Sequence, residues 1–278
     1  MKNKTALITG ASSGIGYETA ILLKELGMKV YGAARRTERM AELEKHGINV
    51  LPLDLTDRAS IKSCVETILS KEGSVDVLVN NAGYGSYGAI ETVPLEEAKR
   101  QFDVNIFGLA ELTKLVLPSM RKNRFGKIVN ISSMAGKFAA PFGGWYHATK
   151  YALEALSDAM RLEVKPFGVD VILIEPGMIQ TEWGLIASEN LRKQSEDSDY
   201  NINAVNTATY LEKHYKYGKL TPPVKIAKVI LKAVCSKHPK QRYVKGYMSK
   251  TFISIKKILT DSMFDMTVKI ALKLKKKL

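Results

Sequence analysis

Short runs of aliphatic and β-branched residues alternate along the chain with stretches whose apolar positions recur every three or four residues. Helical spacing is clear at Ile21, Leu22 and Leu26, which share one helix face. Because strands separated by helices need crossover connections, this alternation predicts an α/β fold: a single doubly wound parallel sheet with helices on both faces. The predicted strands span residues 5–8, 29–33, 49–53, 76–79, 127–131 and 169–174.

Glycines follow the first predicted strand, at the edge of the sheet where ligands of such folds bind. Residues 9–16 read Thr-Gly-Ala-Ser-Ser-Gly-Ile-Gly and lead into a helix. Glycines allow a tight turn and close approach of the backbone to a ligand, and the N–H groups of a helix N-terminus bind phosphate. The pattern favours a dinucleotide site over an ordinary strand–helix turn. Its predicted contacts are Gly10, Ser12, Ser13, Gly14, Ile15 and Gly16.

The glycine spacing resembles that of the short-chain dehydrogenase/reductases. The resemblance extends through the Asn-Asn-Ala-Gly motif at 80–83, Asn105, Ser133, the Tyr146-x3-Lys150 pair and the Pro-Gly pair at 176–177. It is strong over residues 4–182 and looser to about residue 246. It implies a Rossmann-type NADP(H)-binding catalytic domain, which we place at residues 1–250. Residues 241–246 are similar to the last strand of the hydroxysteroid- and retinol-dehydrogenase-like branch.

The resemblance implies that Asn105, Ser133, Tyr146 and Lys150 are catalytic. Tyr146 and Lys150 are four residues apart on one face of the helix expected at 145–165, so the ammonium is expected to lower the pKa of the tyrosine. Tyr146 would then act as acid or base while hydride passes between a nicotinamide and a carbonyl or alcohol carbon. Ser133 would polarise the substrate oxygen, and Asn105 would hold a water beneath the lysine. The alternative is a cofactor-binding sensor or scaffold with little turnover.

Two arginines follow the second predicted strand, where NAD-specific relatives usually carry an acidic residue. Forked guanidinium donors match a 2′-phosphate, so Arg35 and Arg36 favour NADP(H) over NAD(H); a solvated pair of arginines is the alternative. Ile179 and Thr181 are expected beside the nicotinamide carboxamide. The full set of further predicted cofactor contacts is Asp54, Leu55, Asn81, Ala82, Gly83, Tyr146, Lys150, Pro176, Gly177, Ile179 and Thr181.

A long segment at 183–222 separates the sixth predicted strand from the next helix, and a connection of this length is typical of a substrate lid. Aromatic residues gather near the predicted site, which indicates a lipophilic ketone or alcohol of steroid, retinoid or acyl type; packing under the lid is the alternative. These residues are Tyr84, Tyr87, Phe138, Phe142 and Trp145. The family also implies a homo-oligomer, a dimer or tetramer, formed through the helices that contain Asn105 and Tyr146.

The net charge of +14 is confined to one part of the chain: residues 212–278 carry +15 and residues 1–211 carry −1. An apolar stripe flanked by lysines predicts one basic amphipathic helix at 251–278. This helix either packs on protein, which we favour, or makes weak peripheral contact with an anionic membrane. The stripe consists of Phe252, Ile255, Leu259, Met263, Met266, Ile270 and Leu274. No nucleic-acid binding is expected, because no readout module accompanies the charge.

Several other classes of protein are disfavoured. Two cysteines and four scattered histidines lack metal-ligand spacing, so no metal site is predicted, and the thiols are typical of a cytoplasmic protein. The chain contains no run of 18 apolar residues, so no membrane span is predicted. No histidine is paired with a candidate serine nucleophile, which argues against a serine hydrolase.

Overall fold

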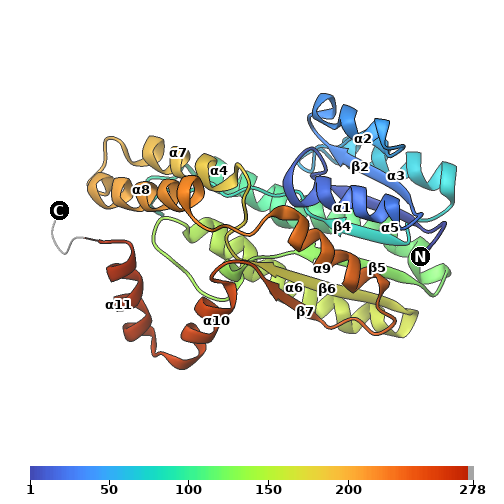
Figure 1. Ribbon diagram of the computed structural model, residues 1–278. Coiled ribbons are helices and arrows are strands. Elements are labelled where there is room, and N and C mark those ends of the chain that lie inside the picture. Colours follow the sequence, from blue (N-terminus) through green and yellow to red (C-terminus); the bar gives the residue numbers. More distant parts are fainter. Residues whose placement is uncertain (275–278) are drawn as a thin grey trace.

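A seven-stranded sheet runs through the computed structural model, which describes residues 1–274 (Figure 1). Its strand order is β3-β2-β1-β4-β5-β6-β7, and every neighbouring pair is parallel. The predicted doubly wound sheet is confirmed, and each predicted strand ends within two residues of its expected bounds. The strands are β1 (Thr5–Thr9), β2 (Lys29–Ala34), β3 (Asn49–Pro52), β4 (Val77–Asn80), β5 (Gly126–Ile131), β6 (Val169–Pro176) and β7 (Arg242–Lys245).

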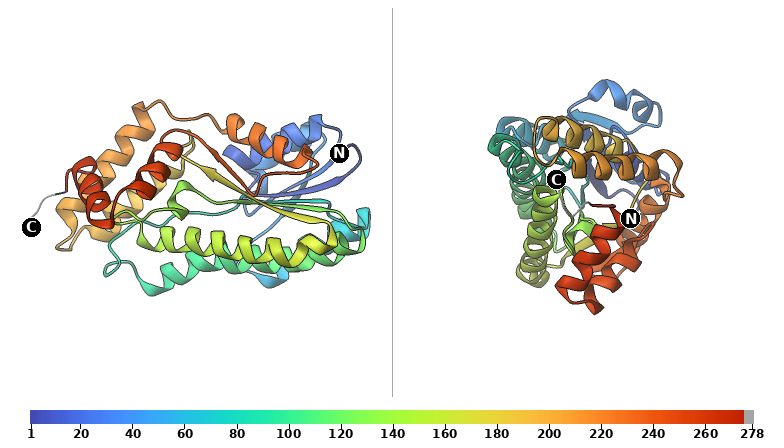
Figure 2. Two further views of the ribbon diagram at one scale, coloured as in Figure 1. Left: turned by 90° about the horizontal axis from the view of Figure 1, so that it is seen from below. Right: turned by 90° about the vertical axis from the view of Figure 1, so that its left-hand side faces the viewer.

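Helices cover both faces of the sheet, as Figure 2 shows from below. Successive strand residues point to opposite faces: Ala6 and Ile8 are buried under one helical layer and Leu7 under the other. The first layer contains α1 (Gly14–Glu25), α2 (Ala41–Lys45) and α9 (Pro223–Cys235), and the second contains α3 (Arg58–Glu72), α5 (Leu109–Lys122) and α6 (Gly144–Val164). The shorter α4 (Leu95–Phe102) and the turn η2 (Asp103–Gly108) precede α5.

The segment predicted as a lid is not an irregular loop. It forms a helical hairpin of α7 (Trp183–Ser195) and α8 (Asn201–Tyr217) at one end of the molecule (Figure 1). Small buried side chains let the two helices approach closely, among them Ala187, Ala204 and Ala208. The Arg192 guanidinium lies 3.1 Å from the Glu212 carboxylate and ties the helices together.

The basic tail forms two helices, α10 (Ser249–Ile258) and α11 (Asp261–Ala271), so the prediction of one continuous helix is wrong. The break has a local cause. Leu259 is extended at the end of α10, and the Thr260 hydroxyl then caps α11 by accepting a hydrogen bond from the backbone N–H of Met263. Predicted tail residues 275–278 lie outside the described part of the chain.

The capped start of α11 changes which side chains face the protein. Phe264 and Val268 are buried in a cluster with Phe138, which follows β5. Met266 and Ile270, which belong to the predicted stripe, are 60% and 71% exposed. The favoured packing of the tail on protein is therefore present: Phe252, Ile255 and Leu259 of the predicted stripe pack in the same cluster, but α11 packs through a different face.

Replacing Phe264 by alanine is expected to destabilise the protein by about 3–5 kcal/mol, because it removes a buried aromatic side chain and leaves a cavity. The matched control is Met266→Ala, two residues along the same helix, which should change the free energy of unfolding by less than about 0.5 kcal/mol. Denaturant unfolding of both variants measures the difference. Equal stabilities would show that α11 does not pack on the domain.

Candidate active site

The glycine turn after β1 is built as a phosphate-binding turn requires. Gly10 and Gly14 have φ angles of +66° and +57°, which L-residues with side chains rarely adopt. A side chain at Gly16 would collide with the Gly10 carbonyl oxygen. Ser13, the residue before α1, makes no capping hydrogen bond through its side chain, so the first N–H groups of α1 are left for a ligand. The turn therefore fits the pyrophosphate of a dinucleotide.

Asn81, which follows β4, fixes the position of this turn. Its side-chain amide donates hydrogen bonds to the carbonyl oxygens of Thr9 (3.0 Å) and Gly10 (3.2 Å). In return the Thr9 hydroxyl accepts from the backbone N–H groups of Asn81 and Ala82. Sequence analysis missed Thr9. Its position directly before the first glycine was the available signal. Strand β1 and strand β4 are thus locked together at the edge where a cofactor binds.

Arg35 and Arg36 follow β2 and are both exposed. The charge of Arg35 acts on Asp54, which places its guanidinium on the same side of the sheet edge. Burial alone would raise the pKa of Asp54, but two hydrogen bonds from Thr56 and nearby arginine charges outweigh it and lower the pKa. Asp54 is therefore a carboxylate that can accept hydrogen bonds, and its bonds with Thr56 stabilise the turn after β3. The Leu55 side chain is buried in the core.

The four predicted catalytic residues come together beyond the ends of β4 and β5. Ser133 lies directly before the turn η3 (Met134–Gly136) and hydrogen-bonds to Tyr146 on α6. The Lys150 ammonium donates to the Ile131 carbonyl oxygen at 2.9 Å and lies 5.7 Å from the centre of the Tyr146 ring. The hydroxyl of the preceding residue, Ser132, is buried and has no hydrogen-bond partner within the described residues. Ser133 is thus the serine beside the tyrosine.

Asn105 sits in η2, a single turn of π-helix. Its amide donates to the Tyr84 carbonyl oxygen (2.9 Å) and to the Thr149 hydroxyl (3.1 Å), and its oxygen accepts from the Tyr84 N–H (3.2 Å). A Cβ atom at Gly83 would stand 2.9 Å from this oxygen and 4.0 Å from the Lys150 nitrogen. Gly83 therefore leaves the space between asparagine and lysine open.

The prediction that Lys150 lowers the pKa of Tyr146 is wrong for the chain itself. Burial raises the pKa of Tyr146 to about 12, against the opposing effect of the hydrogen bond with Ser133. Burial also lowers the pKa of Lys150 to about 8, although the charge of Glu154 acts in the other direction. The cause is desolvation, which disfavours both charged forms. Tyr146 is accordingly protonated at neutral pH and poised to donate.

A pH profile of ketone reduction should reflect this lysine. As the pH rises through about 8, Lys150 loses its proton and no longer stabilises the phenolate that forms when Tyr146 donates, so kcat is expected to fall. Below that pH the ammonium is present and kcat should stay level. Steady-state rates between about pH 6 and 10 test this. A fall centred near the ordinary value of 10.5 would show an unperturbed lysine.

Aromatic rings cover Tyr146 from the lid side. The Trp183 ring, at the start of α7, lies 5.0 Å from the Tyr146 ring and 5.7 Å from the Tyr87 ring. Tyr215 of α8 contacts Trp183 at 6.4 Å between ring centres. Tyr215 was not among the aromatic residues predicted near the site. Gly184 makes this contact possible, because a Cβ atom there would collide with the Tyr215 ring.

The chain after β6 returns to the glycine turn. Gly177 donates its N–H to the Lys245 carbonyl oxygen at 3.0 Å, which holds this loop on β7. Ile179 is buried, and Thr181 faces Gly14, since a Cβ atom there would stand 3.0 Å from the Thr181 methyl group. Pro176 ends β6. The loop therefore borders both the predicted pyrophosphate turn and the lid.

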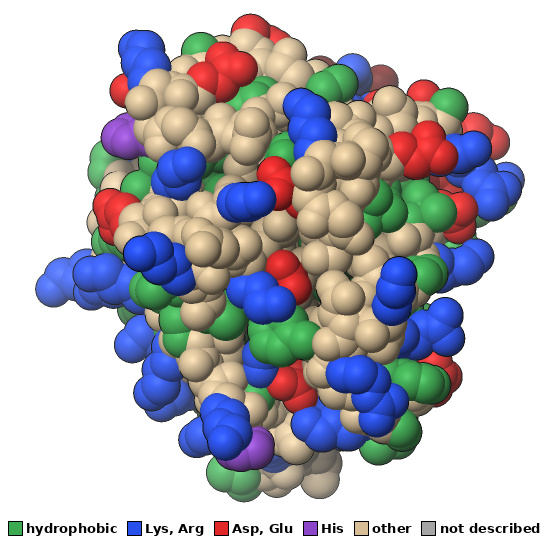
Figure 3. Space-filling view, turned by 90° about the vertical axis from the view of Figure 1, so that its right-hand side faces the viewer, with side chains coloured by type: hydrophobic (Ala, Val, Ile, Leu, Met, Phe, Trp, Pro, Cys, Tyr) green, Lys and Arg blue, Asp and Glu red, His purple; other side chains and the backbone are tan. Residues whose placement is uncertain are grey.

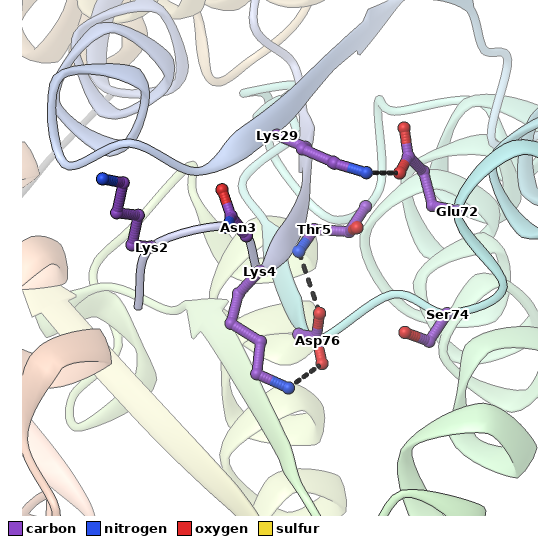
Figure 4. A pocket seen from close by; sticks show the side chains of 8 residues that line it. All are labelled: Lys2, Asn3, Lys4, Thr5, Lys29, Glu72, Ser74 and Asp76. Carbon is purple, nitrogen blue, oxygen red and sulfur yellow. Dashed lines mark hydrogen bonds and ion pairs between the residues drawn. The ribbon is translucent and has the colours of Figure 1, made fainter.

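A surface hollow lies at the opposite edge of the sheet, near the start of β1 (Figure 4). Asp76 there accepts hydrogen bonds from the Thr5 N–H and the Lys4 ammonium, both at 2.9 Å. These bonds join the amino ends of β1 and β4. The polar side chains of the hollow are therefore explained by their role in holding the two strands together. Within residues 1–274, no cluster of three histidine, cysteine or acidic side chains is placed to hold a metal ion.

The site combines the glycine turn after β1 with the tyrosine–lysine pair on α6, both carried by a doubly wound sheet. These features together define a dinucleotide-binding oxidoreductase. The model of the short-chain dehydrogenase family matches residues 4–191, and the chain belongs to this family. It is 40% identical to the probable short-chain type dehydrogenase/reductase VdlC of Helicobacter pylori, with 94% of each chain covered. It is 38% identical to the 3-ketodihydrosphingosine reductase of Bacteroides thetaiotaomicron, covering 97% of this chain and 98% of the relative.

Solved structures agree with the fold. A short-chain dehydrogenase from Streptomyces avermitilis superposes with a TM-score of 0.82 and 30% identity, covering 98% of each chain. A serine dehydrogenase complexed with NADP+ superposes with a TM-score of 0.76 and 25% identity, covering 88% of this chain and 95% of the other.

Proposed function

We propose that the protein is an NADP(H)-dependent oxidoreductase that reduces a lipophilic ketone to a secondary alcohol, with Tyr146 as the proton donor. The observation that carries this proposal is the half-buried Ser133 together with the buried Tyr146, Lys150 and Asn105 beside the glycine turn. A sensor or scaffold does not need this set, so that alternative is not favoured.

A nicotinamide cofactor held by the glycine turn and the loop after β6 would supply the hydride for the carbonyl carbon. The Ser133 hydroxyl donates a hydrogen bond to the carbonyl oxygen and stabilises the negative charge that develops there. Tyr146 then gives its phenolic proton to that oxygen. The Lys150 ammonium stabilises the phenolate that remains, and Asn105 and the Ile131 carbonyl hold the lysine region in place.

The proposed preference for NADP(H) rests on two arginines of this chain and on the cofactor bound in a similar solved structure. Arg35 and Arg36 are exposed beyond β2, and the structure gives neither an ion pair within the described chain. Their guanidinium groups are therefore available to a 2′-phosphate. The serine dehydrogenase that superposes on this chain holds NADP+, which supports the same cofactor here.

The lipophilic substrate class is supported by the rings of Tyr87, Trp183 and Tyr215 around Tyr146. It is also supported by the Bacteroides relative, whose named substrate, 3-ketodihydrosphingosine, is a ketone with a long alkyl chain. The steroid or retinoid class implied by residues 241–246 stays a prediction, as does the acyl-like class.

A series of methyl ketones of increasing alkyl length tests the substrate class. Each added CH2 should raise kcat/KM by about two- to fourfold until the site is filled, since buried apolar surface contributes to binding. Trp183→Ala should flatten this dependence, and Tyr217→Ala, an exposed tyrosine on the lid helix α8, is the matched control. A preference for short or charged carbonyl compounds would contradict the proposed substrate class.

We also propose that the protein is a cytoplasmic homo-oligomer, a dimer or tetramer, formed through α5 and α6 and the segments beside them. Large apolar side chains are exposed on this side: Leu95 at 53%, Phe107 at 61% and Leu162 at 69%. Leu95 and Phe107 border a shallow apolar hollow with Phe102 and Trp145. Contact with membranes, where it occurs, is peripheral and involves residues 251–278.

A further inference from the structure

Helix α11 carries apolar side chains on two opposite faces. Phe264 and Val268 are buried on the domain, whereas Met263, Met266 and Ile270 are 49%, 60% and 71% exposed. At 100° per residue, the centres of these two sets are about 150° apart around the helix. The exposed set, here called the outer face, is therefore not the margin of the packed face. It is a second apolar surface that the domain does not cover.

Exposed lysines accompany the outer face. Lys269 lies about 90° from its centre on α11, Lys273 follows the end of α11, and Lys257 is exposed on α10 next to Ile258, which ends that helix and is itself 80% exposed. In the described part of the chain, none of these three lysines has a carboxylate within ion-pair distance. The acidic side chains of α11 lie elsewhere: Asp261 pairs with Lys256, and Asp265 is about 130° from the centre of the outer face.

The opposite end of the molecule is different. Figure 3 shows that lysine and arginine side chains there stand among acidic ones. Several are paired, such as Lys29 with Glu72 at 2.5 Å and Lys4 with Asp76 at 2.9 Å. Unpaired lysines beside exposed large apolar side chains thus characterise the tail.

We infer that the outer face of α11 docks on the surface of an anionic phospholipid bilayer. Methionine and isoleucine side chains enter the boundary of the acyl region, and the lysines contact the lipid phosphates. Charge decides against a second copy of this chain, because two tails with the same lysines would repel each other. Three apolar side chains and three lysines make a small contact, so binding is reversible and depends on salt. Within residues 1–274, no helix is long and apolar enough to cross a bilayer.

Docking in this way places the lid near the membrane. The Asn206 amide on lid helix α8 donates a hydrogen bond to the Lys273 carbonyl oxygen, just beyond α11, at 3.3 Å. This hydrogen bond connects the end of α11 to the lid. This part of the inference rests on the proposed function: a lipophilic ketone dissolved in the bilayer would meet the enzyme at its lid.

Co-sedimentation with vesicles tests the docking surface. The full-length protein should bind phosphatidylcholine vesicles that contain phosphatidylserine at low salt, should bind pure phosphatidylcholine much less, and should release near physiological ionic strength. The triple variant Met263→Ser, Met266→Ser and Ile270→Ser should lose at least about tenfold in bound fraction. Ile90→Ser, which removes a 59% exposed isoleucine outside the tail, is the matched control and should bind as the wild type does.

Two outcomes overturn the inference: equal binding to anionic and neutral vesicles, or a triple variant that binds as well as the wild type. A triple variant that instead loses only self-association, measured by sedimentation velocity, would assign the outer face to a second copy and would also overturn it. The variant should reduce a water-soluble ketone at the wild-type rate. If the wild type binds vesicles but reduces no ketone, the proposed function fails while the docking surface stands.

Discussion

Tyr146→Phe is expected to lower kcat for ketone reduction by at least about 10²–10⁴-fold, the range for loss of a general acid. The ring and its contacts with Tyr87 and Trp183 remain, so the packing of the site should not change. Binding of NADPH should persist, because the glycine turn is untouched. Only the proton that the phenol donates is removed.

The matched control is Tyr151→Phe, on the same helix α6, where the side chain is 45% exposed. It should retain wild-type kcat. Rates under saturating NADPH and cofactor affinity by fluorescence titration separate chemistry from binding. Near-normal turnover by the Tyr146 variant would remove the tyrosine from the mechanism.

Replacing Arg35 and Arg36 together by alanine is expected to weaken NADPH binding by about 10²–10⁴-fold. A charge-assisted hydrogen bond contributes roughly 1.5–3 kcal/mol, and both arginines are expected to contact the 2′-phosphate. NADH lacks this phosphate, so its affinity should change little. The double variant should therefore lose its preference between the two cofactors.

Arg39→Ala is the control for a general loss of positive charge in this region, because Arg39 lies close by and its guanidinium is 3.6 Å from Glu182. It should weaken NADPH binding far less than the double variant. Equal affinity of the wild type for NADH and NADPH would show that Arg35 and Arg36 do not read the 2′-phosphate.

The sheet could be predicted from sequence because its strands are buried on both faces and read as aliphatic runs, such as residues 169–174. The assembly of Ser133, Tyr146 and Lys150 could be predicted only through the family resemblance, since the tyrosine lies 13 positions after the serine with a turn between them. Their electrostatics could not be predicted. The pKa of Tyr146 depends on burial under Trp183 and Tyr215, which tertiary packing alone decides.

The tail shows a second limit of pattern analysis. A stripe at helical spacing predicted one helix and one apolar face. A cap at Thr260 starts a new helix, and its buried residues are Phe264 and Val268, which lie outside the stripe. A periodic pattern of apolar residues predicts that a helix has an apolar face. It does not predict where one helix ends and the next begins, and two adjacent helices can each pack on the domain through a different face.

The most direct test of the central claim is NADPH consumption by the purified wild-type protein with a long-chain methyl ketone, followed by the absorbance of the reduced nicotinamide and by analysis of the product. We expect ketone-dependent loss of NADPH, with one alcohol formed for each NADPH oxidised, and a much slower reaction with NADH. Tight binding of NADPH without turnover of ketones, or of alcohols in the reverse direction with NADP+, would contradict an enzymatic role and would identify the protein as a cofactor-binding sensor or scaffold.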